Sequence, residues 1–438
     1  MSFSKSFTFA LAVLLLTGLC ANAQKKEQIA PITPAPVTPY SDVRRDSLLN
    51  GFQIVTLERP NSSLLKCDII LRAGAMFDLV DKTGLANLTL ATLMAVNPRV
   101  KEEFESLNAK IDWGVNWDTT WFHIESPATN FDTAMEILAR LLIVENVRPD
   151  AFKQAQQAQL DKLKTRQLTP AERADAAFLS ALYGTHPYGH NLEGEEKSLR
   201  GMKQGDLYDF LKRFYMGNNA FAVVTGNVKH ERILRTFKTF FGGWIKGAIV
   251  QPTFRAPARV MALNFVKVEA PEAATVELRG GVQGVRLTDP DYLAVELLAR
   301  LLNTRLKRAG LEAVAVHHPA RTLPAPFYFT AAATADQAQA ISRQVTELFA
   351  TLATKEITAD ELATSKAALS SEYAARPIEQ FLREIETYNL PKTYPLKINE
   401  QIEKLTAADL QRVAKRLLDA NALTLVALGR VNELKSQL

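Results

Sequence analysis

The sequence feature that most constrains the fold of this chain is an internal duplication. Residues 206–213 (Asp-Leu-Tyr-Asp-Phe-Leu-Lys-Arg) align without a gap with residues 409–416 (Asp-Leu-Gln-Arg-Val-Ala-Lys-Arg), at an offset of 203 residues. The alignment continues over four further pairs: Asn218 with Asn421, Val223 with Val426, Gly226 with Gly429, and Val228 with Val431. Each copy has the pattern of a helix, an Asn-containing turn and an apolar strand that ends at glycine.

The beginnings of the two copies are also similar. Residues 69–74 (Ile-Ile-Leu-Arg-Ala-Gly) match residues 276–281 (Val-Glu-Leu-Arg-Gly-Gly), and two matches in the same order indicate duplicated halves. Strand patterns are interspersed with helical patterns at 85–95, 100–107, 131–142, 151–165, 170–182 and 204–214. Such a sequence predicts an α+β fold of two tandem similar domains, each a largely antiparallel sheet with helices packed on one face.

The boundaries of the halves follow from proline content and from the first strand pattern. Four prolines make residues 24–45 an extended spacer, and regular structure is expected from about Asp46. We therefore predict an N-terminal domain at 46–250, a linker at 251–257 that contains Pro252 and Pro257, and a C-terminal domain at 258–438.

The first 23 residues have the pattern of a secretory signal peptide. Lys5 precedes a short apolar run, and Ala21-Asn22-Ala23 ends it, so cleavage is predicted after Ala23. The run is too short for a permanent membrane span. This pattern predicts an exported, periplasmic protein. Lipid attachment at Cys20 is the alternative, but Leu19 stands where a small residue is preferred.

Composition excludes several functional classes. Removal of residues 1–23 changes the formal net charge from +5 to +4, and no dense basic run points to nucleic-acid binding. Cys67 is then the only cysteine, so no disulfide framework exists, and a lone cysteine in an apolar strand is more often packed than reactive. A hydrophobic content of 47% can supply a large core, and nothing after residue 23 resembles a transmembrane span.

Several motifs, weak singly but ordered along nearly the whole mature chain, resemble the pitrilysin/insulinase zinc metallopeptidase family, which includes the mitochondrial processing peptidase. They are Asn50-Gly51, Ala73-Gly74, Gly84-Leu85-Ala86, His186-Pro187-Tyr188-Gly189, Gly194, Phe214-Tyr215, Asn218-Asn219-Ala220, Gly226-Asn227-Val228, Tyr394-Pro395-Leu396 and residues 405–410. The resemblance implies that each half is a metallopeptidase-like clam-shell half, and that two chains enclose a chamber for unfolded peptide.

Active members of that family carry H-x-x-E-H on the helix that opens with Gly-Leu-Ala. Positions i and i+4 share a helical face, so the two His bind one zinc while the Glu activates the bound water. This chain has Asn87 and Ala91 at the ligand positions and Leu90 at the base position. The Glu expected from a later helix is also missing, because residues 150–170 hold only Asp161 inside the segment. The prediction is a lost zinc site, with no catalytic residue and no cofactor.

Relatives in this family also hold the substrate backbone with an Arg and a Tyr in the second half. The matching segment here, residues 304–313, is shortened, and Ala313 stands where the Tyr is expected. Arg305 and Arg308 are the candidate substrate-binding residues that this leaves.

Other chemistry-bearing residues have plainer interpretations. His186 and His190 are four apart, but Pro187 and Gly189 argue against a continuous helix that would bring them together. His317 and His318 are adjacent on an expected strand and point to opposite faces, and His123 is expected to be packed or hydrogen-bonded. The run from Trp113 to Trp121, expected on one strand, either lines a peptide- or glycan-binding surface or belongs to the core. Gly280-Gly281-Val282-Gln283-Gly284 lacks the ending of a phosphate loop.

Three functional hypotheses follow. The leading one is an exported, non-catalytic subunit that forms a hetero- or homodimer with an active zinc peptidase of the same family. The second is a free-standing scaffold that binds extended peptides. The third is an active zinc protease with displaced ligands, which the count of missing ligands disfavours.

Overall fold

The computed structural model describes residues 40–79, 81–143, 147–248, 257–258, 260–419 and 422–432. The expected signal peptide with Cys20 and Ala23, the spacer up to residue 39 and residues 251–256 of the expected linker lie outside these described residues. Within them, every helix is too short or too polar to cross a lipid bilayer.

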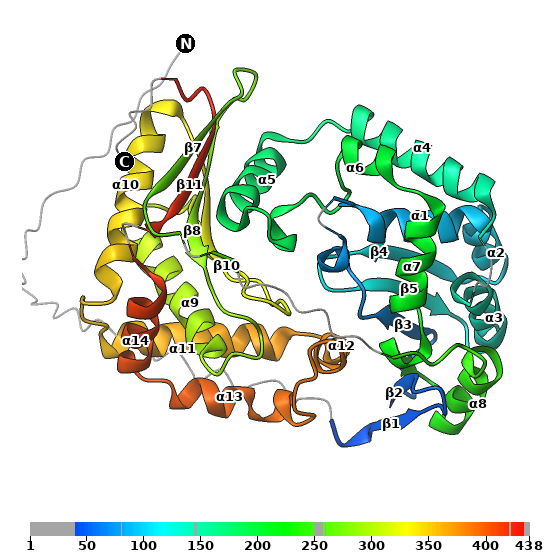
Figure 1. Cartoon of the computed structure of the whole chain (residues 1–438). Helices are drawn as coiled ribbons and strands as arrows, with labels where there is room; N and C mark the ends of the chain where they lie inside the picture. The colour runs from blue at the N-terminus through cyan, green and yellow to red at the C-terminus, as the bar shows by residue number, and fades with distance from the viewer. Residues whose placement is uncertain are drawn as a thin grey trace, which may run out of the picture. The chain divides into compact units, whose positions relative to one another are not determined.

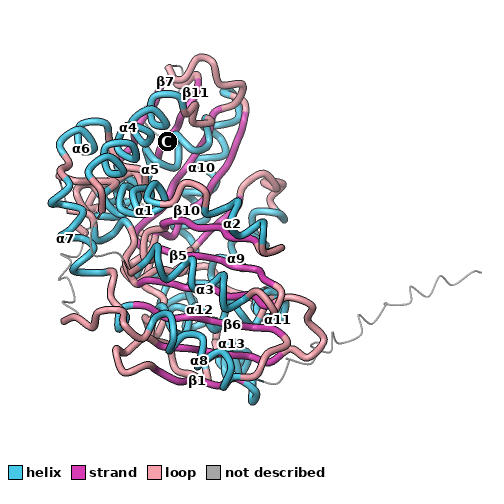
Figure 2. Tube along the Cα trace, turned by 90° about the vertical axis from the view of Figure 1, so that its right-hand side faces the viewer, coloured by secondary structure: helices cyan, strands magenta, loops and turns pink. Residues whose placement is uncertain are grey.

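The first of two sheets comes from the first half of the sequence (Figure 1). Its strands are β1 (Val43–Ser47), β2 (Gln53–Glu58), β3 (Leu65–Leu71), β4 (Lys110–Val115), β5 (Thr120–Ser126) and β6 (Ala220–Gly226). Their order across the sheet is β1-β2-β6-β3-β5-β4, and Figure 2 shows the strands side by side from β5 through β6 to β1. All pairs are antiparallel except the parallel pair β2–β6.

Eight α-helices belong to this half among the described residues. They are α1 (Leu85–Val96), α2 (Val100–Ser106), α3 (Phe131–Leu142), α4 (Pro149–Thr165), α5 (Pro170–Tyr183), α6 (Glu196–Gly201), α7 (Gln204–Phe214) and α8 (His230–Phe241). Apart from α5, they share one apolar core with the inward-facing residues of the sheet, such as Ile69 and Val224.

The second sheet is built in the same way from the second half. Its strands are β7 (Asn264–Glu269), β8 (Val276–Gln283), β9 (Ala315–His317), β10 (Pro326–Ala333) and β11 (Thr424–Gly429), in the order β7-β11-β8-β10-β9. Its helices are α9 (Tyr292–Arg308), α10 (Ala335–Leu352), α11 (Ala359–Ala375), α12 (Ile378–Tyr388), α13 (Tyr394–Lys404) and α14 (Ala407–Leu417).

The two sheets have the same topology. The order β2-β6-β3-β5-β4 in the first corresponds strand by strand to β7-β11-β8-β10-β9 in the second, including the single parallel pair. The aligned repeat segments become α7 with β6 and α14 with β11. The predicted α+β fold of two similar, largely antiparallel units is therefore confirmed.

One detail differs from the prediction, because each sheet also has a helix on its second face. Helix α5 begins at a capping box in which Thr169 accepts from the Glu172 amide, and it packs on β11, β8 and β7 of the second sheet (Figure 1). Its buried Phe178 and Leu182 lie in one apolar cluster with Val426 of β11. Helix α5 therefore belongs to the first half by its position in the sequence but packs on the sheet of the second half.

Helix α12 makes the reciprocal contact on the first sheet. Its Leu382, fully buried, packs with Val55, Phe221 and Val223 on the face opposite the main core. Arg72 donates two hydrogen bonds, of 3.0 and 2.7 Å, to the carbonyl of Glu386 in the last turn of α12. Because both faces of β6 and β11 are covered, every residue of these two strands is buried.

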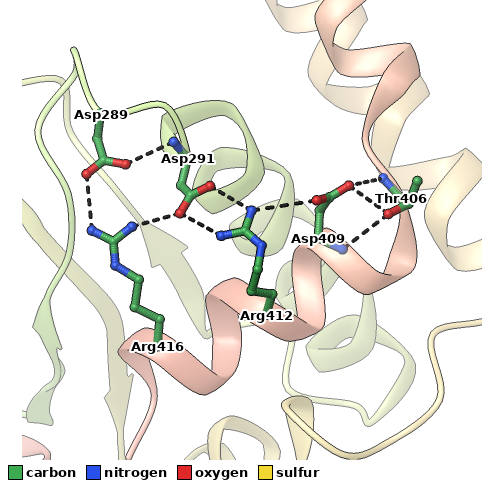
Figure 3. A network of polar contacts seen from close by, with 6 residues as sticks. All are labelled: Asp289, Asp291, Thr406, Asp409, Arg412 and Arg416. Carbon is green, nitrogen blue, oxygen red and sulfur yellow. Dashed lines mark hydrogen bonds and ion pairs between the residues drawn. The ribbon is translucent and has the colours of Figure 1, made fainter.

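Helix α14 is held to the start of α9 by a network of ion pairs (Figure 3). Arg412 donates to both oxygens of Asp291, at 2.9 and 2.7 Å, and Arg416 bridges Asp291 and Asp289 at 2.7 and 3.1 Å. Hydrogen bonds and charge from Arg412, joined by Arg416, hold the pKa of Asp291 below its ordinary value.

This network predicts an acid-sensitive contribution to stability. A carboxyl whose pKa is lower in the folded chain stabilises the fold above its unfolded-state pKa of about 4, and this stabilisation is lost as the pH falls below that value. We expect Asp291→Asn to reduce the free energy of unfolding at pH 7 by about 1 kcal/mol, since the arginines are largely exposed. Urea denaturation at pH 7 and pH 3 measures this, and an equal loss at both values would contradict it.

Candidate functional site

The helix expected to carry the metal motif, α1, is present and its start is well defined. The carboxylate of Asp78 accepts hydrogen bonds from the backbone amides of Gly84 and Ala86, at 2.7 and 2.8 Å. Gly84 has a positive φ of 92°, and a Cβ there would lie 2.7 Å from the carbonyl oxygen of Glu193. Glycine is therefore required both for the backbone turn and for the close approach of the segment at Glu193.

An amide, Asn87, stands at the first ligand position of the motif, and a second amide lies on the neighbouring helix α4. Asn87 is half-buried and its Nδ2 donates to the carbonyl oxygen of Leu192. On α4, which packs along α1, buried Gln159 donates through Nε2 to the next carbonyl, that of Glu193, at 2.7 Å. Both amides therefore hold the same short segment against the pair of helices. Their donor groups are used in hydrogen bonds to backbone.

The other two motif positions are part of the apolar core. Leu90 is 4% exposed and Ala91 packs against the same cluster, and neither side chain has a lone pair for a metal. Asp161 on α4 is exposed and accepts from Gln157 at 2.8 Å. Over the described ranges, no group of three or more His, Cys, Asp or Glu side chains is placed to hold a metal ion.

The two candidate substrate-binding arginines lie at the end of α9. Arg305 is buried, and its guanidinium donates to both oxygens of Glu361, at 3.0 and 2.9 Å, and to the carbonyl of Glu356 at 2.8 Å. Arg308 is exposed and lies 3.4 Å from Glu361. The structure gives Arg305 a role in joining α9 to α11, while substrate binding by either arginine stays a prediction.

The histidines lie in separate environments. His186 and His190 flank the 3-10 helix Pro187–Gly189, so they are not on one α-helical face, as predicted. His317 contacts Thr330 at 3.0 Å, whereas buried His318 lies 3.0 Å from the carbonyl of Val285. Cys67 is fully buried in the main core, which confirms its interpretation as a packed residue.

The expectation of one strand from Trp113 to His123 is wrong. The chain forms a hairpin, β4 and β5, because Asn116 Oδ1 accepts the amides of Asp118 and Thr119, both at 2.8 Å. The aromatic residues from Trp113 to Trp121 are therefore divided between two strands and the turn that joins them. Trp117 is buried against Tyr188, with ring centroids 5.6 Å apart, whereas Trp121 lies on the sheet face that α12 covers.

Asp118 in this hairpin turn connects elements from both halves of the chain. It is 6% exposed, and its Oδ1 accepts from the hydroxyl of Tyr188 at 2.8 Å. Its Oδ2 accepts from the amide of Thr322 at 3.3 Å and from the hydroxyl of Tyr388 on α12 at 3.1 Å. A buried carboxylate with three donors is well compensated, so it fixes the mutual position of these segments.

A cavity of about 520 Å³ opens beside this junction, between the first sheet and α12. The lining residues are Asp68, Ile70, Asp112, Asn116, Thr119, Trp121, His123, Gln380, Arg383, Glu384, Thr387 and Tyr388. The α12 residues recur at spacings of three and four, so one face of that helix forms one wall. The sheet contributes two rows of side chains across neighbouring strands.

The polar centre of the cavity wall is Asp68. Its two oxygens contact His123 Nδ1 at 2.7 Å and Arg383 Nη1 at 2.6 Å. Burial raises the pKa of Asp68, but the hydrogen bonds from His123 and Arg383 outweigh it and leave that pKa below its ordinary value. The hydrogen bond to Asp68 in turn raises the pKa of His123. His123 is therefore hydrogen-bonded, as predicted.

Sequence reasoning missed Asp118 and the cavity. Asp68 was a usable signal, because a carboxylate in the apolar strand β3 needs a buried partner. Once the hairpin is recognised, strand pairing places His123 opposite Asp68 on one side and opposite Asp112 on the other. Arg383 offers no such signal, because its helix meets the strands only through tertiary contact.

With the fold and the site described, the chain can be compared with known proteins. Residues 202–369 match the family described as peptidase M16 inactive domain. The structure of a peptidase M16 inactive domain from Pseudomonas fluorescens superposes with a TM-score of 0.79 at 20% identity, over 88% of this chain and 97% of that one. The first half of the periplasmic protease PqqL from Escherichia coli gives 0.74 at 15% identity, over 89% and 92%.

Curated relatives agree at the level of sequence. An uncharacterized zinc protease of Rickettsia felis is 21% identical over 205 residues, which is 46% of this chain and 50% of that protein. The mitochondrial-processing peptidase subunit beta of Saccharomyces cerevisiae is 21% identical over 256 residues, 57% of this chain and 55% of that protein. The chain spans about half the length of the curated relatives it matches. The chain has the fold of M16 peptidase structures, and its residues 202–369 match the inactive-domain model of that family.

The Asn87 hydrogen bond is testable by truncation. Asn87→Ala leaves the half-buried carbonyl of Leu192 without its donor, so we expect the free energy of unfolding to fall by about 1 to 2 kcal/mol. Chemical denaturation of the variant beside Ala91→Ser, which leaves that hydrogen bond in place, measures the effect. A stability equal to that of the unmodified chain would show that the amide does not anchor the segment.

The Asp68–His123 pair predicts a titration that NMR can follow. The His123 pKa is expected above its ordinary value of about 6.5, and Asp68→Asn is expected to lower it. Because the folded pKa is raised, the pair's contribution to stability is present below about pH 6.5 and is lost as the pH rises through the folded value. His317, whose pKa burial lowers, serves as the control and should titrate unchanged.

Proposed function

We propose that this chain is a proteolytically inactive M16 homologue that acts as the non-catalytic subunit of a pair with an active zinc peptidase of the same family. The observation that carries the proposal is the state of α1, where Asn87 is hydrogen-bonded to backbone and Leu90 and Ala91 pack into the core. The fold is retained over both halves while the residues that zinc chemistry needs are replaced.

The loss of chemistry follows from the side chains present. A catalytic zinc site uses three protein ligands and a bound water, and a nearby carboxylate or equivalent base activates that water. Leu90 provides no base. The buried polar side chain of α4 is the amide of Gln159, whose Nε2 already donates to the carbonyl of Glu193. A single change cannot rebuild such a site, because both helices would need new ligands.

Relatives support export and pairing. The Escherichia coli structure is of a periplasmic protease, and the first 23 residues of this chain have the pattern of a signal peptide. The yeast relative is described as a subunit of a processing peptidase. By this reading the chain is exported to the periplasm and contributes binding surface, not metal chemistry, to an assembly that handles peptides.

A free-standing peptide-binding scaffold is the second candidate, and the edge of the first sheet favours it. Strand β4 is an outer strand, so one side of its backbone has no strand partner among the described residues. An extended peptide can add to such an edge through main-chain hydrogen bonds. A hollow of about 540 Å³ lies at the same edge, lined in part by Lys101, Lys110 and Ile111.

Co-purification from the native host tests the proposal. We expect the tagged chain to recover a relative that carries H-x-x-E-H, with zinc and peptide cleavage present only in the fractions that contain this relative. Zinc is measured by elemental analysis and cleavage with an unstructured fluorogenic peptide. As a matched control, Glu→Gln in the partner's motif should abolish cleavage, whereas Asp161→Asn in this chain should not.

The alternatives predict different results. A monomeric, metal-free chain that binds extended peptides with no partner present would replace subunit pairing with the scaffold function. About one zinc per isolated chain, with cleavage that follows it through purification, would contradict inactivity and revive a protease with displaced ligands.

A further inference from the structure

The cavity between the first sheet and α12 has a composition that selects for charge. Three of its lining side chains are carboxylates, Asp68, Asp112 and Glu384, and one is a guanidinium, Arg383. The formal charge of the wall is therefore −2 with His123 neutral and −1 with His123 protonated. Arg383 does not act as a free cation, since Asp68 lies 2.6 Å from it.

Asp112 is the carboxylate left available at this wall. It is exposed, its Oδ1 accepts only the amide of the following residue, Trp113, and it has no cationic partner within 4 Å in the described part of the chain. Glu384 on the facing helix is partnered, because its Oε1 lies 3.5 Å from Arg376 Nη1 and accepts from Gln380 Nε2 at 3.0 Å. Burial raises the pKa of Glu384, and its Oε2 has no hydrogen-bond partner among the described residues.

An apolar and aromatic surface forms another part of the same cavity wall. Ile70 and Trp121 form the row of side chains next to Asp68 and His123 on the sheet. The indole of Trp121 lies over Gly114 of β4, where a Cβ would come within 2.6 Å of its Cζ2 atom. Asp112 and Gly114 are two residues apart on β4 and share one face of the sheet, so the ring over Gly114 and the Asp112 carboxylate line the same cavity.

We propose that this cavity binds an organic cation, a primary ammonium or guanidinium group on a short alkyl chain, with the cation at Asp112 and the alkyl chain on Ile70 and Trp121. The volume of about 520 Å³ is in the range of small-ligand sites. An aromatic face beside a carboxylate attracts a cation through both the ring quadrupole and the charge. The proposal does not depend on subunit pairing, because every residue involved belongs to this chain.

Such a group has two sources, the side chain of a Lys or Arg in a peptide or a free alkylamine. Isothermal titration of the purified full chain with Nα-acetyl-arginine amide and Nα-acetyl-lysine amide represents the first source, and agmatine represents the second. Nα-acetyl-norleucine amide is the matched neutral probe, and acetate is the anionic one. We expect saturable binding of the cationic probes only, and tighter binding of the amides than of agmatine if the natural source is a peptide.

Variants locate the binding. Asp112→Asn, an exposed change that leaves the fold intact, is expected to weaken binding of the cationic probes by about threefold to tenfold. Trp121→Leu should weaken it by about twofold to fivefold. Asp161→Asn removes the same charge at an exposed position on α4, so it should leave binding unchanged.

Three outcomes would overturn the inference. They are equal binding of the norleucine and arginine amides, preference for acetate, and cation binding that Asp112→Asn and Asp161→Asn reduce equally. None of these depends on whether a partner is recovered from the native host, so failure here and failure of the proposed function are distinguishable.

Discussion

The constraint on which the rest of this structure depends is that the inner strands β6 and β11 are covered on both faces of their sheets. Every residue of β6 and β11 is buried, so helices on one face of each sheet are not enough to cover these strands. The second side is covered by a helix from the opposite half, α5 on the second sheet and α12 on the first. Apolar burial contributes roughly 25 cal/mol per Å² removed from water, and this exchange makes each half depend on the other for part of it.

The exchange also creates the junction at Asp118. Once α12 lies on the first sheet, Tyr388 reaches the turn between β4 and β5, where Tyr188 and the amide of Thr322 also converge. A carboxylate at this depth is stable only with its full set of donors, so the junction specifies one arrangement of the segments. The cavity beside it exists because α12 crosses the sheet with polar residues on its near face, including Arg383 and Glu384.

The α1 region is held in place by backbone hydrogen bonds and core packing. Gly84 and the amides at the helix start are still needed to pack the segment at Glu193, and Asn87 and Gln159 now bond its carbonyls. Leu90 of this helix packs into the main core. Helix α9 gives a similar case. The guanidinium of Arg305 donates hydrogen bonds to Glu361 and so holds α9 against α11.

The sequence by itself determined what depends on local pattern and side-chain identity. The aligned segments 206–213 and 409–416 predicted two copies of one topology, and Leu and Ala at positions 90 and 91 have no lone pairs in any fold. The β4–β5 hairpin could also have been predicted from the sequence, because Asn116 is a residue type that favours turns and its side chain accepts the amide of Asp118. Tertiary structure alone decided which sheet receives α5 and α12, and therefore the Asp118 junction and the Asp68–His123–Arg383 cluster. The physical reason is that an amphipathic helix specifies that an apolar face must be buried, but the surface that buries it is set by contacts between residues hundreds of positions apart.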